Sequence, residues 1–155
     1  MTLYALRPTP ETGSLEDAEV VDESRYGWQF LEQTIALWRL VDDGRAGEIE
    51  AIKDRVALAA SDGEPRFEVQ DLHDLVRLIM GVEDAIVAAG IVDHHWRVPA
   101  DNLEELVRRV PGVDLTTERS LESKTHALGE VMVNAVSLRN FLVNAAREGC
   151  VVVLG

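Results

Sequence analysis

Lysine is almost missing from this sequence, and cations in general are scarce. Lys53 and Lys124 are the only lysines among 15 cationic side chains, which face 28 carboxylates and leave a formal net charge of -13. Because no cluster of lysine and arginine occurs, the field of the chain repels nucleic acid and anionic lipid surfaces. The charge therefore excludes nucleic-acid and membrane partners and favours a basic protein as the partner.

Cysteine and long apolar runs are nearly absent as well. Cys150 is the only cysteine, which excludes an internal disulfide and a cysteine-rich zinc site and fits a reducing compartment. Apolar runs such as residues 150–154 are far shorter than the roughly 20 residues that a membrane helix needs. The N-terminus lacks the cationic segment followed by an apolar stretch that is typical of a secretion signal. From these absences we expect a cytoplasmic protein.

Enough apolar side chain is present for one core. The chain has 155 residues, of which 46% are hydrophobic, and this length is typical of a single domain. Its most acidic stretch lies between Arg7 and Arg25, where Pro8, Pro10 and Gly13 disfavour a helix. The carboxylates in this stretch are Glu11, Glu16, Asp17, Glu19, Asp22 and Glu23. We interpret the stretch as a loose, solvated segment, with a binding arm as the alternative.

Five segments repeat apolar residues at three- and four-residue steps, which is the period of an amphipathic helix. Gly90 and Gly149 follow the third and the fifth segment at places suited to a helix end. The third segment is long enough to form a single structural spine. The helices are expected at residues 24–41, from about 45 to 61, at 68–90, at 101–110 and at 118–148.

Residues 2–6, 92–98 and 150–154 are expected to be extended, the last because they are rich in β-branched side chains. The sequence thus predicts a mainly α fold: a single-domain bundle of about five helices, with room for a small two- or three-stranded β patch near the chain termini. We divide the chain into an acidic, partly extended N-terminal arm over residues 1–23 and a helical bundle domain over residues 24–155.

Histidine and carboxylate side chains provide the metal-site candidates. Asp93, His94 and His95 are consecutive, and zinc and iron accept both ligand types. On an extended segment the two histidines point to opposite faces, so only one of them could join a site. His126 and Glu130, one turn apart on one helix face, could add further ligands. Since no glycine-rich phosphate loop, nucleophile elbow or paired-cysteine motif occurs, we predict no cofactor.

Polar residues in a single row interrupt the last, largely apolar helical segment: His126, Glu130, Ser137, Asn140 and Asn144. We interpret this row as the exposed stripe of the helix, with a polar ligand pocket as the alternative. Trp28 and Trp38 lie on the strongest apolar stripe and are predicted core residues. Trp96 lies next to Arg97 and could anchor an interface, where both residue types are enriched.

Three functions remain open. The first is a non-enzymatic acidic protein-binding module, such as an inhibitor or immunity-type protein for a basic partner, in which long-range attraction speeds encounter. The second is a metal-binding protein or metal-assisted hydrolase that uses the five candidates above. The third is a structural helical bundle that associates with itself. The incomplete ligand sets favour a non-enzymatic role. The predicted partner-binding residues are Glu16, Asp17, Glu19, Asp22, Glu23 and Trp96.

Overall fold

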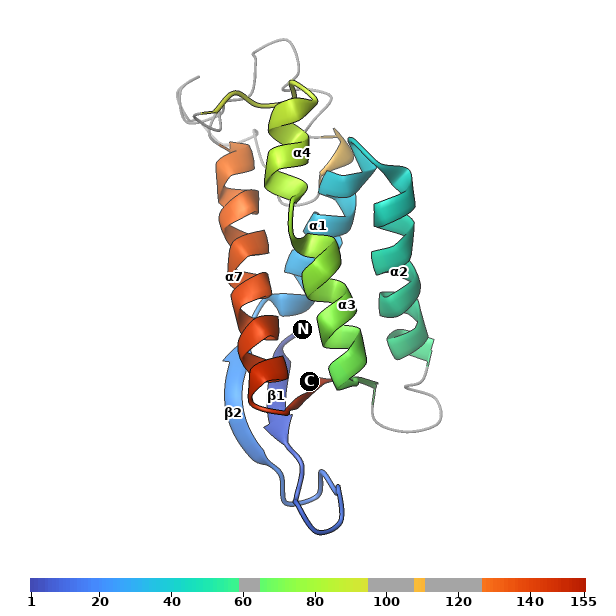
Figure 1. Cartoon of the computed structure of the whole chain (residues 1–155), viewed down its shortest axis with the longest axis vertical. Helices are drawn as coiled ribbons and strands as arrows, with labels where there is room; N and C mark the ends of the chain where they lie inside the picture. The colour runs from blue at the N-terminus through green and yellow to red at the C-terminus, as the bar shows by residue number, and fades with distance from the viewer. Residues whose placement is uncertain (59–64, 95–107, 111–126) are drawn as a thin grey trace.

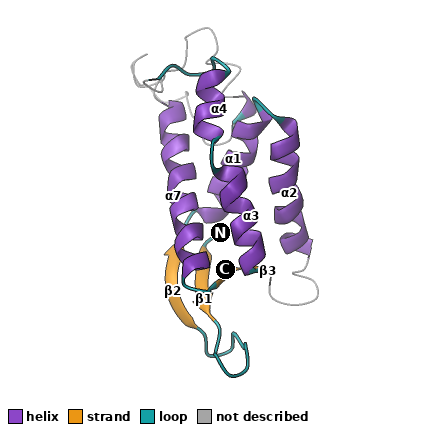
Figure 2. Cartoon of the chain, viewed as in Figure 1, coloured by secondary structure: helices purple, strands orange, loops and turns teal. Residues whose placement is uncertain are grey.

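The computed structural model describes residues 1–58, 65–94, 108–110 and 127–155. Helices form a bundle with a small antiparallel sheet at one end (Figures 1 and 2). The helices are α1 (Gly27–Arg39), α2 (Asp43–Leu58), α3 (Val69–Ile79), α4 (Val82–Ala88) and α7 (Ala127–Arg147). The strands are β1 (Leu3–Arg7), β2 (Glu19–Ser24), β3 (Arg66–Phe67) and β4 (Val151–Leu154).

The predicted class, mainly α with a β patch, is confirmed, but both counts change. Within the described residues, four helices have 11 residues or more, namely α1, α2, α3 and α7, and the short α4 continues α3. The described residues therefore contain four long helices where the sequence predicted a bundle of about five helices, and the short helix expected at residues 101–110 lies mostly outside the described residues. The sheet has four strands rather than two or three, because β2 and β3 add to the predicted terminal pair.

Helix α1 packs on both α2 and α7, and its apolar stripe supplies much of the core. Trp28 and Trp38, the predicted core tryptophans, are confirmed as buried. The indole Nε1 of Trp38 donates a hydrogen bond of 2.6 Å to the carbonyl oxygen of Leu78 in α3. Because a buried indole N–H needs an acceptor, this bond satisfies Trp38 and fixes α3 against α1.

The expected single spine at residues 68–90 is two helices. Met80 is extended, with ψ of 135°, and Gly81 has φ of 86°, a left-handed conformation that glycine adopts without a Cβ clash. The chain therefore bends between α3 and α4. Gly90, with φ of 74°, ends α4 as the sequence predicts.

The end of α7 leads directly into the sheet. Gly149 has φ of 67°, and its N–H donates to the carbonyl of Ala146 at 3.1 Å. The N–H of Cys150 donates to the carbonyl of Ala145 at 2.9 Å, which completes a Schellman motif. The predicted helix stop at Gly149 is thus confirmed, and β4 starts two residues later.

The sheet brings the chain ends together. Its order is β2-β1-β4-β3, and all neighbours are antiparallel. Thr2 and Gly155 exchange two backbone hydrogen bonds of 3.0 Å at its end. Leu3 and Ala5 of β1 are buried against the helices, and a Cβ on Gly27 would lie only 2.5 Å from Cδ1 of Leu3. The absence of a side chain at Gly27 therefore allows α1 to begin close to the sheet.

Residues 1–23, predicted as an acidic arm, include β1 and most of β2, and β1 pairs with β2 and β4. The turn between β1 and β2 extends below the helices in Figure 1. The extended segment predicted at residues 92–98 is described only as far as His94. Its described residues, 92–94, form a bend and a turn rather than a strand, so that part of the prediction is wrong.

Candidate functional site

The predicted partner-binding acids gather on one β-hairpin. Glu16 and Asp17 lie in the turn before β2, whereas Glu19, Asp22 and Glu23 lie on β2 itself. All five are exposed. We call residues 7–25 the acidic hairpin; it carries six acids and two bases, a net charge of -4. Trp96, the remaining predicted partner-binding residue, lies outside the described residues.

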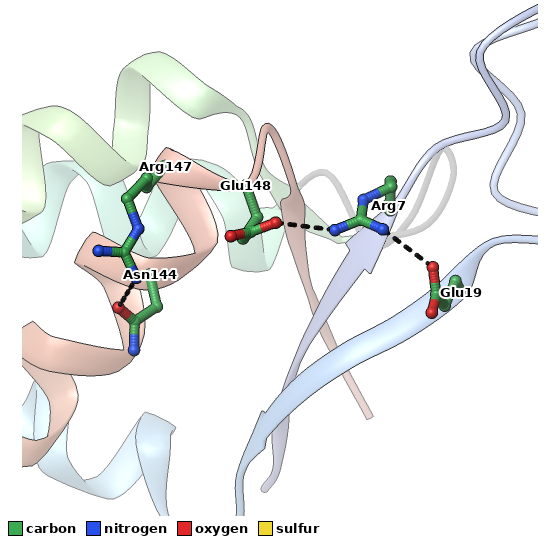
Figure 3. Close-up of polar contacts among 5 residues, drawn as sticks. All are labelled: Arg7, Glu19, Asn144, Arg147 and Glu148. Carbon is green, nitrogen blue, oxygen red and sulfur yellow. Dashed lines mark hydrogen bonds and ion pairs between the residues drawn. The ribbon is translucent and has the colours of Figure 1, made fainter.

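Arginines at its two ends neutralise only part of this charge. Arg7, at the end of β1, contacts Glu19 at 3.1 Å and Glu148, just after α7, at 2.9 Å (Figure 3). Arg25 contacts Glu23 at 3.2 Å. No cation of the described chain lies within ion-pair distance of the other hairpin carboxylates, which are Glu11, Glu16, Asp17 and Asp22.

A groove of about 360 Å³ runs beside the acidic hairpin. The end of β2, the start of α1 and the second half of α7 form its walls, and we call it the β2–α7 groove. Asp22 and Glu23 give it two carboxylates, and the rings of Tyr26 and Phe30 pack at 6.1 Å. It is lined by Asp22, Glu23, Ser24, Arg25, Tyr26, Phe30, Ser137, Asn140, Phe141 and Asn144.

The wall that α7 supplies contains Ser137, Asn140 and Asn144 of the polar row found in the sequence, together with Phe141. Glu130, Ser137, Asn140 and Asn144 are exposed, which confirms the predicted stripe for its described members. Figure 3 shows Asn144 at the end of α7 near the sheet, where its Oδ1 accepts a hydrogen bond of 3.0 Å from Arg147. The second half of the stripe is therefore both exposed and part of a groove, since α7 contacts β2.

The metal-site candidates are only partly described. Asp93 and His94 are exposed and follow α4, and Glu130 is exposed in the first turn of α7. His95 and His126 lie outside the described residues. Among the residues that the structure does describe, no group of three or more histidine, cysteine, aspartate or glutamate side chains could hold a metal ion.

Cys150 lies between α7 and β4 and is fully buried. Burial raises the pKa of its thiol, and the nearby Arg7 opposes this effect only in part. Because the thiolate is the reactive form of cysteine, this position does not favour a nucleophilic role.

A buried carboxylate near β3, at the opposite edge of the sheet, serves the fold. Asp71 in α3 is bonded to Arg55 of α2, and its Oδ2 accepts a hydrogen bond of 2.9 Å from the backbone N–H of Glu68. The backbone N–H of Asp71 in turn donates to the side chain of Glu68, so the two residues form a capping box at the start of α3. The hydrogen bond with Asp71 raises the pKa of Arg55, and the coulombic attraction of the same carboxylate adds to it.

The bend between α3 and α4 leaves a second, apolar groove of about 350 Å³ against the first half of α7. Its lining is Glu83, Gly129, Met132, Val133 and Val136. Val133 is 67% exposed, and Met80 at the nearby bend is 55% exposed. This groove and the β2–α7 groove lie at opposite ends of α7.

Sequence reasoning found the acids of the site but missed the strand that carries them. The only local signal for β2 is the β-branched pair Val20–Val21 after a proline- and glycine-containing segment. The groove gives no local signal, because Asp22 and Asn144 are separated by most of the chain.

No protein-family model, no curated protein and no solved structure matches this chain. None of the helices in the described ranges is both long and apolar enough to cross a membrane. Any functional assignment therefore depends on the geometry above.

Proposed function

We propose that this chain is a non-enzymatic acidic binding module whose partner is a basic protein, and that the acidic hairpin is its contact surface. One observation carries the proposal: the described chain leaves Glu11, Glu16, Asp17 and Asp22 without an ion pair on a hairpin that projects from the bundle. Unpaired surface carboxylates keep their full charge available to a partner.

Electrostatics gives this surface two properties. Long-range attraction from a net charge of -13 raises the rate at which a basic partner arrives. The hairpin then orients the encounter, because its charge is local and its backbone is fixed by pairing with β1. The rings of Tyr26 and Phe30 beside the acids provide apolar area of the type that anchors interfaces.

A charge-matched pair of variants tests the location. The hairpin variant carries Glu16→Gln, Asp17→Asn and Asp22→Asn, and the control carries Glu48→Gln, Asp54→Asn and Asp84→Asn on exposed helix positions. Both remove three negative charges from the same residue types. The probe is a fluorescent peptide of about seven residues in which arginine and valine alternate, long enough to cover β2.

We expect the hairpin variant to bind the peptide about tenfold more weakly than wild type, and the control to change by less than about threefold. Raising salt from about 0.01 M to 1 M shortens the screening length from about 30 Å to 3 Å and should weaken binding to wild type strongly. Equal losses in the two variants would show that only net charge matters and would overturn the proposed surface. Absence of binding at low salt would overturn the function itself.

A further inference from the structure

Strand β2 forms an edge of the sheet, and its outer side is open. β1 is its only strand neighbour in the described chain. Five of the six β2 residues are exposed, Ser24 being half-buried, and Val20 is 56% exposed. Sheet edges of this kind present backbone donors and acceptors to which another extended segment can pair.

The backbone at Glu23 faces away from β1. Thr2 and Gly155 exchange both hydrogen bonds, so by the alternation of an antiparallel ladder Tyr4 bonds to β4 and not to β2. Glu23 lies opposite Tyr4, and its N–H and C=O therefore point outwards. In agreement, the N–H of Glu23 donates to Oδ1 of Asp22 at 2.8 Å. A local side-chain bond thus occupies a donor that an incoming strand could use.

The charge on β2 decides which strand can pair there. Glu19, Asp22 and Glu23 would face the same carboxylates if a second copy paired with this edge, and like charges on paired strands are destabilising. A register shift between Ala5 and Leu6 leaves Val21 without a partner in β1, and such bulges also discourage pairing of identical edges. A cationic segment meets attraction where a second copy meets repulsion.

We propose that β2 accepts an extended, cationic segment of the partner protein as a fifth strand of the sheet. This inference rests on the proposed function and specifies the binding mode, which is addition of a strand to the sheet. Backbone hydrogen bonds at Glu23 set the register, and the carboxylates select arginine or lysine at alternate positions.

The β2–α7 groove receives the cationic side chains that face the helices. Asp22 lies opposite Ala5, whose side chain is buried against the bundle, so Asp22 is on the helix-facing side of the sheet. A guanidinium bonded to its carboxylate would lie beside the amide oxygens of Asn140 and Asn144 and near the ring of Tyr26. Carboxylate, amide oxygen and aromatic face are the groups that bind arginine.

The test separates backbone pairing from charge. The alternating arginine and valine peptide is compared with an analogue N-methylated at every central residue, which keeps the charge but has no amide donor at the central positions. We expect wild-type protein to bind the parent peptide at least about tenfold more tightly than the analogue. A peptide with serine in place of arginine should not bind measurably.

Two variants at one position provide the complementary test on the protein. Glu23→Pro removes the outward N–H and the carboxylate, whereas Glu23→Gln removes only the charge. If β2 accepts a strand, the proline variant binds the parent peptide about tenfold more weakly than the glutamine variant. Both should bind the N-methylated analogue equally, because its methyl groups prevent its backbone from approaching the strand edge. Circular dichroism spectra that match wild type show that both variants are folded.

The outcomes distinguish this inference from the function on which it rests. Equal binding of parent and N-methylated peptides, with the hairpin variant still weakened, would overturn strand addition and leave the acidic binding surface intact. Failure of both peptides to bind at low salt would overturn both. Equal binding of the serine peptide would overturn the cationic selection.

Discussion

The two edges of the sheet differ in length, burial and charge. β3, at one edge, consists of Arg66 and Phe67, and Phe67 is only 1% exposed. β2, at the other edge, has six residues, of which Ser24 is the only one that is not exposed. One edge is short, with Phe67 buried and Arg66 exposed, and the other is long and almost entirely exposed.

The charges follow the same division. Beside β3, Arg66 contacts Glu68 at 2.6 Å, and Asp71 is bonded to both Arg55 and the backbone of Glu68. Beside β2, several carboxylates have no cation of the described chain within ion-pair distance. An edge whose polar groups are satisfied internally contributes to stability, whereas an edge with unpaired charge is suited to interaction.

Among the substitutions that test this comparison, the one at Phe67 should have the largest effect on the free energy of unfolding. Its ring lies 6.4 Å from the ring of Trp28, and Phe67→Ala should lower the free energy of unfolding by about 3–5 kcal/mol because a large buried side chain is lost. Val20→Ala, on exposed β2, should change it by less than about 1 kcal/mol. Urea denaturation measures both. Similar losses at the two positions would remove the distinction between the edges.

Substitution of Asp71, the buried carboxylate near β3, should have the next largest effect on stability. Asp71→Ala removes the capping box and the contact with Arg55, and we expect a loss of about 2 kcal/mol in the free energy of unfolding. Asp74 is also an aspartate and lies three positions further along the chain. Asp74→Ala should lower the free energy of unfolding by less than about 0.5 kcal/mol. An Asp71 variant as stable as the Asp74 variant would contradict the structural role.

The pH dependence of this contact follows from the direction of its pKa shift. Because the folded state raises the pKa of Arg55, the stability that this group contributes is complete below the ordinary arginine value and is lost only as the pH rises through the raised one. The difference in the free energy of unfolding between wild type and Arg55→Gln should therefore be constant from neutral to mildly alkaline pH. Urea denaturation of wild type and Arg55→Gln across this range checks it.

The same contrast explains what could be predicted from the sequence. α1 is buried on most of its circumference, and α2 and α7 bury one stripe each. The spacing of apolar residues predicted all three, and glycine marked the ends of α4 and α7. β2 buries almost nothing, so it has no apolar alternation, and its conformation depends on pairing with β1. An open edge is therefore the part of a sheet that periodicity detects least well.

The candidate site shows a similar limit. The acids of the hairpin were predicted because charge density is visible in the sequence. Their arrangement was not, because it requires α7 to lie over β2 and bring Asn140 and Asn144 beside Asp22. The bend at Gly81 was missed for another reason: the apolar period continues through it, and only the backbone angle of the glycine breaks the helix.

A smaller effect is expected at Arg7, the cation that joins the open edge to α7. Its contacts with Glu19 and Glu148 are exposed to solvent, so Arg7→Gln should cost only about 0.5–1 kcal/mol of stability. The substitution also frees the carboxylate of Glu19, and binding of the cationic peptide should become tighter rather than weaker. Thermal denaturation and peptide titration measure the two effects. Weaker binding would mean that Arg7 positions the surface.

The smallest expected effect has the opposite sign to those at the other edge. Asp22→Asn keeps the oxygen that accepts the N–H of Glu23 but removes one charge from a hairpin of net charge -4. Relief of repulsion should raise the free energy of unfolding by at most about 0.5 kcal/mol at low salt, and the gain should disappear at high salt because exposed charges are screened. Urea denaturation at two salt concentrations measures the change. A loss of more than about 1 kcal/mol would show that the Asp22 carboxylate supports the fold, as Asp71 does, and that the open edge is also a structural one.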